Sequence, residues 1–151
     1  MKIPKELLQF SKFKTLIIIS GQQEAEFFFA YQGVIEKIAY FKLKKLTYSD
    51  KEGFIGRGRT KYGSSGSVLD DLKTKAKQEF VVSFKKAIKE IELKTDFDDV
   101  YLLSPSHFLE FVRGLLSLSL KGKIRFTLQG NYLKAAPIDV IKRISKEIKG
   151  R

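Results

Sequence analysis

Thr15-Leu16-Ile17-Ile18-Ile19-Ser20 decides the fold, because this aliphatic run of strand length predicts a β-strand that is covered on both faces. Residues 24–31 and 34–43 are two further strand candidates. They are separated by Gln32-Gly33, which has the composition of a tight hairpin turn. The sequence therefore predicts an antiparallel meander of three strands at the start of the chain.

From residue 69 onward the hydrophobic pattern changes to a helical period. Apolar side chains recur at steps of three and four residues from Leu69 to Ile91, which predicts one long amphipathic helix. Ser104 followed by Pro105 predicts a later helix start, with Ser104 as the N-cap. The remaining elements are, in chain order, a strand at 100–103, a helix from Pro105 to about Leu120, a strand at 124–128 and a helix that Pro137 opens.

This order of elements indicates an α/β fold of mixed (α+β) character. A meander followed by alternating helices and strands predicts a mixed β-sheet of about five strands with helices packed on its faces. The length of 151 residues fits one compact domain, so residues 1–151 are predicted to form a single domain. A short helix is also expected at Pro4–Phe10, because proline is tolerated at the first helical position.

The composition excludes several classes of site. The chain has no cysteine, which rules out disulfides, thiolate zinc sites, iron–sulfur clusters and cysteine nucleophiles. His107 is the one histidine, which rules out a metal site built on a histidine pair. The apolar runs are far shorter than the roughly 20 residues that span a bilayer, and none resembles a secretion leader. We therefore expect a cytoplasmic protein without a membrane segment.

One glycine-rich stretch comes close to a nucleotide-binding motif. Residues 53–60 nearly fit the pattern G-x-x-x-x-G-K-[ST], but Arg59 replaces the lysine that reaches the phosphates. The motif also needs a helix to begin at its end, whereas residues 60–63 intervene before any helical period. We therefore reject this motif and expect no cofactor and no metal.

The segment from residue 47 to residue 67 interrupts the regular pattern and is predicted to be a flexible basic Gly/Ser loop. It holds five of the eleven glycines and several cations, a composition typical of a functional or mobile connection. Its glycines let the backbone approach a ligand closely, and its cations attract phosphate. Ser67 and Asp70 form a capping-box-like start for the long helix, and a helix N-terminus favours anions. The residues expected to bind RNA or phosphate are Lys51, Gly56, Arg57, Gly58, Arg59, Lys61, Gly63, Ser64, Ser65, Gly66 and Ser67.

The charge balance predicts an anionic partner. The chain carries 29 Lys and Arg against 17 Asp and Glu, a formal net charge of +12. Residues 68–96 are nearly balanced, so the surplus lies in the loop and in the regions on either side. Such a distribution is typical of binding to a nucleic-acid backbone, so RNA or the ribosome is the expected partner, with the oligomeric state left open. On the last helix the cations opposite the apolar stripe are Lys142, Arg143, Lys146 and Lys149.

Three stretches of the sequence carry a resemblance to a known family. They are Ser49-Asp50-Lys51-Glu52-Gly53, Lys77-Gln78-Glu79-Phe80 and Asp99-Val100-Tyr101-Leu102-Leu103-Ser104-Pro105-Ser106-His107-Phe108-Leu109. In this order they resemble the bacterial host-attachment-like family, which is related to the middle domain of the archaeo-eukaryotic class-1 peptide-chain release factors. The resemblance extends over residues 16–148. It implies a release-factor middle-domain-like fold and a role related to translation.

The resemblance also implies that the chain lacks a catalytic residue. In the release-factor middle domain, a basic loop carries Gly-Gly-Gln before the long helix, and this glutamine enters the ribosomal peptidyl-transferase centre. Ser65 and Gly66 fall where the two glycines would be, and Ser67 falls where the glutamine would be. The implied function is therefore a non-catalytic RNA- or ribosome-binding domain. A second departure is at residues 129–133, where the host-attachment-like pattern has Lys-Asp-Leu.

Two other functions stay open on the sequence. A hydrolase or nuclease would use Asp98 or Asp99 together with His107, which follows the end of a strand, where α/β proteins often place ligands. His107 has no serine or carboxylate partner by motif and is better explained as a polar residue at a helix start, while the two aspartates have the composition of a turn. The other possibility is a protein-interaction domain that binds no nucleic acid.

We predict that the protein releases no peptide from peptidyl-tRNA on programmed ribosomes with any stop codon. The reason is that Ser67 stands where the resemblance requires glutamine. Peptide release over time, compared with a reaction without the protein, measures this directly. Release above that background would contradict the non-catalytic interpretation.

Overall fold

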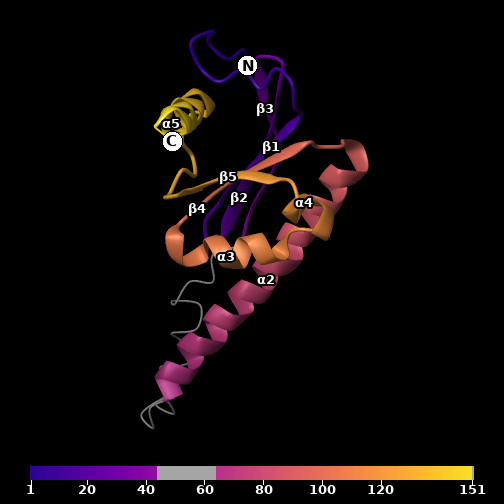
Figure 1. Ribbon diagram of the computed structural model, residues 1–151. Coiled ribbons are helices and arrows are strands. Elements are labelled where there is room, and N and C mark those ends of the chain that lie inside the picture. Colours follow the sequence, from indigo (N-terminus) through magenta and orange to yellow (C-terminus); the bar gives the residue numbers. More distant parts are fainter. Residues whose placement is uncertain (44–63, 151) are drawn as a thin grey trace.

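A computed structural model describes residues 1–43 and 64–150, with side chains described for residues 1–43 and 73–150 (Figure 1). In these parts of the chain one five-stranded sheet is packed against helices. The strands are β1 (Thr15–Ser20), β2 (Glu24–Tyr31), β3 (Val34–Lys42), β4 (Asp99–Ser104) and β5 (Ile124–Gln129). The helices are α2 (Ser64–Lys94), α3 (Ser106–Leu115), α4 (Leu118–Lys121) and α5 (Pro137–Lys149).

The sheet is mixed, with the strand order β3-β2-β1-β4-β5. The central strand β1 pairs with β2 in antiparallel orientation, and Ile17 lies opposite Phe28. On its other side β1 pairs with β4 in parallel orientation, and Ile17 lies opposite Tyr101. The outer pairs follow the same division, since β2 and β3 are antiparallel whereas β4 and β5 are parallel. The α/β fold class with a mixed five-stranded sheet and an antiparallel meander is therefore confirmed.

β1 is covered on both faces, as its aliphatic sequence predicts. All of its residues are buried. Leu16 and Ile18 belong to the core beneath α2, α3 and α4, whereas Ile17 and Ile19 belong to the core beneath α5. Helices accordingly lie on both sides of the sheet in Figure 1. We call these two sides the α2 face and the α5 face.

Phenylalanine rings join the elements of the α2 face. Phe84 of α2 lies 5.5 Å from Phe27 of β2 between ring centroids. Phe80, one turn earlier, lies 5.4 Å from Phe41 of β3 and 5.3 Å from Phe108 of α3. Aromatic pairs at such separations add to the stabilisation from buried apolar area. The C-terminal half of α2 is therefore fixed both to the sheet and to α3.

The turn between β2 and β3 has the geometry that its composition predicts. Gln32 has φ 47° and Gly33 has φ 76°. Two consecutive positive φ angles are what a tight two-residue hairpin needs, and asparagine- or glycine-like residues adopt them at low cost. The edge strand β3 is therefore set in register with β2 by a local feature of the sequence.

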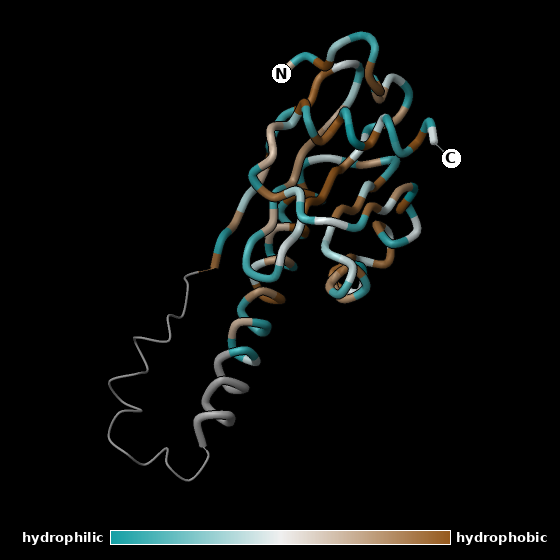
Figure 2. The backbone as a smooth tube through the Cα atoms, turned by 90° about the vertical axis from the view of Figure 1, so that its left-hand side faces the viewer, coloured by the Kyte–Doolittle hydropathy of each residue, from teal (hydrophilic) through white to brown (hydrophobic). Residues whose placement is uncertain are grey.

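α2 begins at Ser64, three residues before the Ser67 start that the capping pattern predicts. Residues 64–67, expected at the end of the basic loop, form its first turn instead. At 31 residues the helix is about 46 Å long. Its N-terminal half extends well beyond the sheet in Figure 1, and the coloured part of the same helix also continues beyond the sheet in Figure 2. Among residues 73–94, burial begins at Phe80, because the earlier part of the helix does not lie on the sheet.

The helix expected at Pro4–Phe10 is wrong. This segment makes a turn, and Lys2 forms a β-bridge with Val34 of β3. The side-chain amide of Gln9 donates hydrogen bonds to the carbonyl oxygens of Pro4 at 2.6 Å and Leu7 at 3.0 Å. A side chain therefore binds carbonyl groups that a helix would satisfy with its own backbone.

The helix expected to run to about Leu120 is divided in two. α3 ends at Leu115, Leu116 has an extended backbone, and Ser117 is the N-cap of α4. The Oγ atom of Ser117 accepts a hydrogen bond from the backbone N–H of Leu120 at 3.2 Å. Serine hydroxyls compete with helix hydrogen bonds in this way, and the buried side chain of Leu116 anchors the break.

We predict that Phe84→Ala lowers the free energy of unfolding by about 3–5 kcal/mol, because the Phe84 ring is fully buried in the α2 face. Val82→Ala is the matched control on the same helix, since Val82 is 67% exposed. It should change the free energy of unfolding by less than about 0.5 kcal/mol. Urea unfolding followed by circular dichroism measures both. Equal decreases in the free energy of unfolding for the two variants would contradict the packing described for α2.

Candidate nucleic-acid interface

The predicted phosphate-binding loop falls largely on residues that the structure does not describe. Ser64, Ser65, Gly66 and Ser67 form the first turn of α2, for which the backbone is described. This turn lies at the outer end of α2, far from both chain termini in Figure 1. The predicted site residues that lie outside the described residues are Lys51, Gly56, Arg57, Gly58, Arg59, Lys61 and Gly63.

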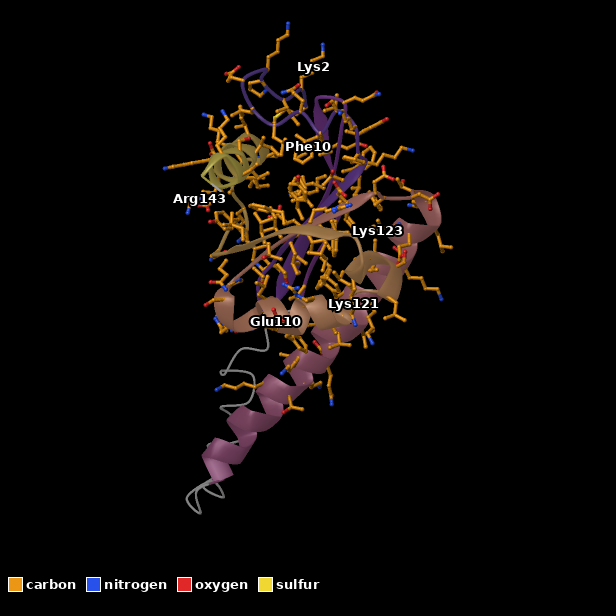
Figure 3. The ribbon with its side chains drawn as sticks, in the orientation of Figure 1. Lys2, Phe10, Glu110, Lys121, Lys123 and Arg143 are labelled. Carbon is orange, nitrogen blue, oxygen red and sulfur yellow. The ribbon has the colours of Figure 1, made fainter. Side chains whose placement is uncertain are left out.

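A row of cations follows the outer side of α5, opposite its apolar stripe. We call these residues the α5 basic face: Lys142, Arg143, Lys146 and Lys149, all of which are exposed. Arg143 Nη2 lies 3.0 Å from the Oε1 atom of Glu147, one turn further along the helix. In Figure 3, Arg143 lies on the side of α5 that is turned away from the sheet. The expectation that these cations lie opposite the apolar stripe is confirmed.

The N-terminal segment is attached to α5 by a specific contact. The backbone N–H of Leu8 donates a hydrogen bond to Ser145 Oγ at 3.0 Å. Beside this bond, residues 6–8 and the end of α5 enclose a small hollow of about 170 Å³ that Ile148 and Lys149 also line. The buried ring of Phe10 then packs 5.5 Å from Tyr101, which fixes the segment against the sheet. The helix that carries the α5 basic face is therefore held from two sides.

Few cations are neutralised by carboxylates in the described part of the chain. Four ion pairs form among the described side chains, and two of them join residues three or four positions apart on one helix. Pairs of this kind between exposed side chains contribute little to stability. Most of the described lysines therefore present their charge to solvent and to any anionic partner. The pairs are Lys37–Glu26, Arg113–Glu110, Arg125–Asp99 and Arg143–Glu147.

The C-terminal ends of the parallel strands β1 and β4 meet at one edge of the sheet, where α/β proteins often bind ligands. His107, the second residue of α3, lies at this edge. Its Nε2 atom is 2.7 Å from Nε2 of Gln22, which follows β1, so the two side chains share a hydrogen bond. This position confirms His107 as a polar residue at a helix start.

Ser104, expected as the N-cap of α3, is instead the last residue of β4, and Pro105 takes the N-cap position. The Ser104 hydroxyl is buried and has no hydrogen-bond partner among the described residues. The equivalent serine at the end of β1, Ser20, is also buried, but its hydroxyl donates to the carbonyl oxygen of Gly21 at 3.0 Å. The two strand ends therefore differ in how their hydroxyl groups are satisfied.

Asp98 and Asp99 lie at the other end of β4 from His107. Asp98 Oδ2 accepts a hydrogen bond from the backbone N–H of Lys14 at 2.9 Å, and Asp99 Oδ1 lies 3.1 Å from Arg125 Nε. At about 3.3 Å per residue, the six residues of β4 span about 17 Å. The proposed enzyme site that joins either aspartate to His107 is therefore wrong. Within the described residues there is no group of three or more His, Asp or Glu side chains placed to hold a metal ion.

Tyr101 in the middle of β4 is a structural residue. Its ring packs between Phe10 at 5.5 Å and Phe126 at 5.3 Å. Burial, and then the negative charge of Asp99, raises the pKa of the Tyr101 phenol above its ordinary value. Because both effects oppose ionisation, Tyr101 stays neutral at physiological pH and serves as part of the α5 face.

Sequence reasoning missed Glu26 of β2, a buried carboxylate that positions the connection to α5. Its Oε2 atom lies 2.7 Å from Lys37 Nζ, and its Oε1 atom accepts a hydrogen bond from the backbone N–H of Lys134 at 2.9 Å. Lys134 has φ 65°, a left-handed conformation that a non-glycine residue adopts when other contacts compensate. The two residues are 108 positions apart, so no local pattern indicates the contact.

No protein-family model and no curated protein matches the chain. Among solved structures it is similar to an archaeal translation termination factor, aRF1, with a TM-score of 0.47 and 12% identity. It is also similar to Dom34 of S. cerevisiae, a translation termination-like factor involved in RNA quality control pathways, with a TM-score of 0.47 and 11% identity. A third similar structure is the PilM–PilN type IV pilus biogenesis complex, with a TM-score of 0.40 and 14% identity.

These similarities cover most of this chain and less than half of each neighbour. The matches cover 90% of the chain for aRF1, 93% for Dom34 and 93% for the pilus complex. The chain spans 39%, 38% and 44% of those proteins, respectively. The host-attachment-like family has no counterpart among these findings. In the described part of the chain, no helix combines the length and the apolar character that crossing a membrane requires.

We predict that Ser104→Ala leaves the free energy of unfolding unchanged or raises it by up to about 1 kcal/mol, because it removes a buried hydroxyl without a partner. Ser20→Ala, at the end of the neighbouring strand, should lower it by about 1 kcal/mol, because it removes the donor to Gly21. Chemical unfolding of both variants and the wild type measures the difference. A loss at Ser104 as large as that at Ser20 would show that the Ser104 hydroxyl has a partner.

Proposed function

We propose that this protein is a non-catalytic RNA- or ribosome-binding domain with a role in translation. The proposal rests on the surplus of cations, +12 over 151 residues, of which few are engaged in ion pairs among the described side chains. Phosphate groups bind such cations with release of counterions, which gives affinity that is independent of base sequence. The basic Gly/Ser-rich segment before α2 is the part of the chain to which we assign the phosphate contacts.

The geometry of α2 supports this assignment. The basic segment is joined to the first turn of α2, and this turn lies at the end of the helix that extends beyond the sheet. Residues at the end of a projecting helix can enter a narrow cleft of a large partner that is too small for the five-stranded sheet. A helix N-terminus also favours anions, which adds to the attraction from Arg57, Arg59 and Lys61.

Two observations support a non-catalytic role. The release-factor resemblance requires glutamine for peptide release at the position that Ser67 takes in this sequence. The alternative enzyme site is not formed, because Asp99 begins β4 whereas His107 follows the other end of that strand. A domain that binds RNA through phosphate contacts needs neither arrangement. The relation to translation is inferred from the resemblance in sequence.

We predict that the triple variant Arg57→Ala, Arg59→Ala and Lys61→Ala binds RNA with a shallower dependence of affinity on salt. Each removed cation should make the slope of log affinity against log salt shallower by roughly 0.7 to 0.9. The loss should be about equal for two RNA oligonucleotides of unrelated sequence, because phosphate contacts do not read bases. Fluorescence anisotropy across a salt series measures the slope, and co-sedimentation with ribosomes tests the same variant on the larger partner.

The α5 basic face supplies the matched control. Lys142→Ala, Lys146→Ala and Lys149→Ala remove the same charge from exposed positions at the other end of the molecule. The α5 variant should unfold at nearly the wild-type temperature, since substitutions at exposed positions have small effects on stability. Thermal unfolding also checks that the variant at Arg57, Arg59 and Lys61 is folded. If only the α5 variant changes the slope of log affinity against log salt, the phosphate contacts would be assigned to α5 instead. Unchanged slopes in both variants would contradict RNA binding by either region.

A further inference from the structure

A groove of about 510 Å³ lies between the C-terminal half of α2 and the connection from α3 to α4. Its volume is within the range of about 300–1,000 Å³ that is typical of ligand sites in proteins. It lies far along α2 from the first turn of that helix, so it is separate from the segment to which RNA binding is assigned. The residues that line it are Lys85, Ile88, Lys89, Glu92 and Leu93 of α2, and Gly114, Leu115, Leu116 and Ser117.

The floor of the groove is apolar and its edge carries exposed leucines. Ile88 and Leu116 are buried and form part of the wall nearest the core. At the edge, Leu93 is 78% exposed, and Leu118, next to the lining residue Ser117, is 86% exposed. These two leucines add exposed apolar surface beside the hollow.

The charged side chains of the groove favour a negatively charged occupant. Lys85 and Lys89 are exposed and lie one turn apart on α2, so both line the same side of the groove. The one lining carboxylate, Glu92, already accepts a hydrogen bond from Ser117 Oγ at 3.2 Å through its Oε2 atom. The lining residues therefore carry two positive charges against one negative charge, and this surplus favours carboxylates of a bound partner.

Gly114 lines the groove and has open space beside it. A Cβ atom built on Gly114 would have no heavy atom within 4 Å, so the space beside this residue is empty. Glycine is a poor helix former, and alanine would fit at this position of α3 without a clash. The missing side chain is therefore not required by packing within the described residues.

We propose that this groove binds an acidic amphipathic peptide segment of a partner protein. An apolar side chain of the peptide enters the hollow against Ile88 and Leu116, and its carboxylates face Lys85 and Lys89. A peptide fits better than a small molecule, because the exposed leucines continue the apolar surface beyond the hollow. Amphipathic segments commonly bind between two helices in this way, with apolar anchors at helical spacing.

The test selects binders from a displayed library of random peptides of about 16 residues, using the full chain as bait. Enriched peptides are synthesised, and their affinities are measured by fluorescence anisotropy against the wild type and a set of variants. Gly114→Leu fills the groove, with Gly114→Ala as the smaller step. Lys85→Glu with Lys89→Glu reverses the charge of the wall. Lys75→Glu with Lys86→Glu is the matched control, because both residues are exposed on α2 and neither lines the groove.

We expect enriched peptides to be acidic and to contain large apolar residues. Gly114→Leu and the double reversal at Lys85 and Lys89 should each weaken binding by about tenfold or more. The control at Lys75 and Lys86 should change affinity by no more than about twofold. Circular dichroism and thermal unfolding check that each variant is folded. The charge reversal keeps the test decisive if Gly114→Leu does not fold, because Lys85 and Lys89 are exposed.

Four results would overturn the proposal. The first two are that the selection recovers no binder, or recovers binders without acidic residues. The other two are that the groove variants bind the peptide as tightly as the wild type does, or that the control variant at Lys75 and Lys86 loses as much affinity as they do. RNA affinity that falls with the reversal at Lys85 and Lys89, without loss of peptide binding, would assign the groove to nucleic acid instead. Self-association that Gly114→Leu abolishes would assign the groove to a second copy of the chain. The RNA-binding variants at residues 57–61 leave the groove intact, so the two proposals can fail separately.

Discussion

The burial of β1 on both faces is the constraint on which the rest of the structure depends. Its side chains alternate between the α2 face, with Leu16 and Ile18, and the α5 face, with Ile17 and Ile19, so both sides need a cover. Its backbone is paired on one side with antiparallel β2 and on the other with parallel β4. A parallel neighbour requires a long crossover connection. α2 belongs to that crossover, which explains why it lies on the sheet.

This constraint fixes one half of α2 and leaves the other half free for a different role. The C-terminal half is held by Phe80 and Phe84, whereas residues 73–79 are exposed or half-buried. Because a helix is stiff, fixing one half also fixes the direction of the other half, which projects beyond the sheet (Figure 1). The projecting end is therefore presented in a defined direction by packing that lies several turns away.

Much of the fold could be predicted because its signals are local. The bounds of β1 and β2 follow from short apolar runs. The turn residues Gln32-Gly33 indicate that β3 follows β2 as the second strand of a hairpin. The helix expected at Pro4–Phe10 is wrong because side-chain hydrogen bonds from Gln9 decide the conformation of that segment. Glu26 was missed because its contact with Lys134 joins residues 108 positions apart. The same holds for the site. Helical spacing places the cations of α5 on its outer side. The groove beside Gly114 depends on how α3 packs against α2, which the spacing of residues does not reveal.

The two proposed contacts share one helix, and this sets their spatial relation. The first turn of α2 is at residues 64–67, and the groove is lined by residues 85–93 of the same helix. At 1.5 Å per residue, Gly66 and Ile88 are about 33 Å apart along the axis. This separation is large enough for RNA at one end and a peptide in the groove to bind without contact. The continuous helix also prevents the two from changing their distance freely. If both proposals hold, a peptide bound in the groove and RNA bound before α2 would lie at a fixed distance from each other, because one continuous helix joins the two places.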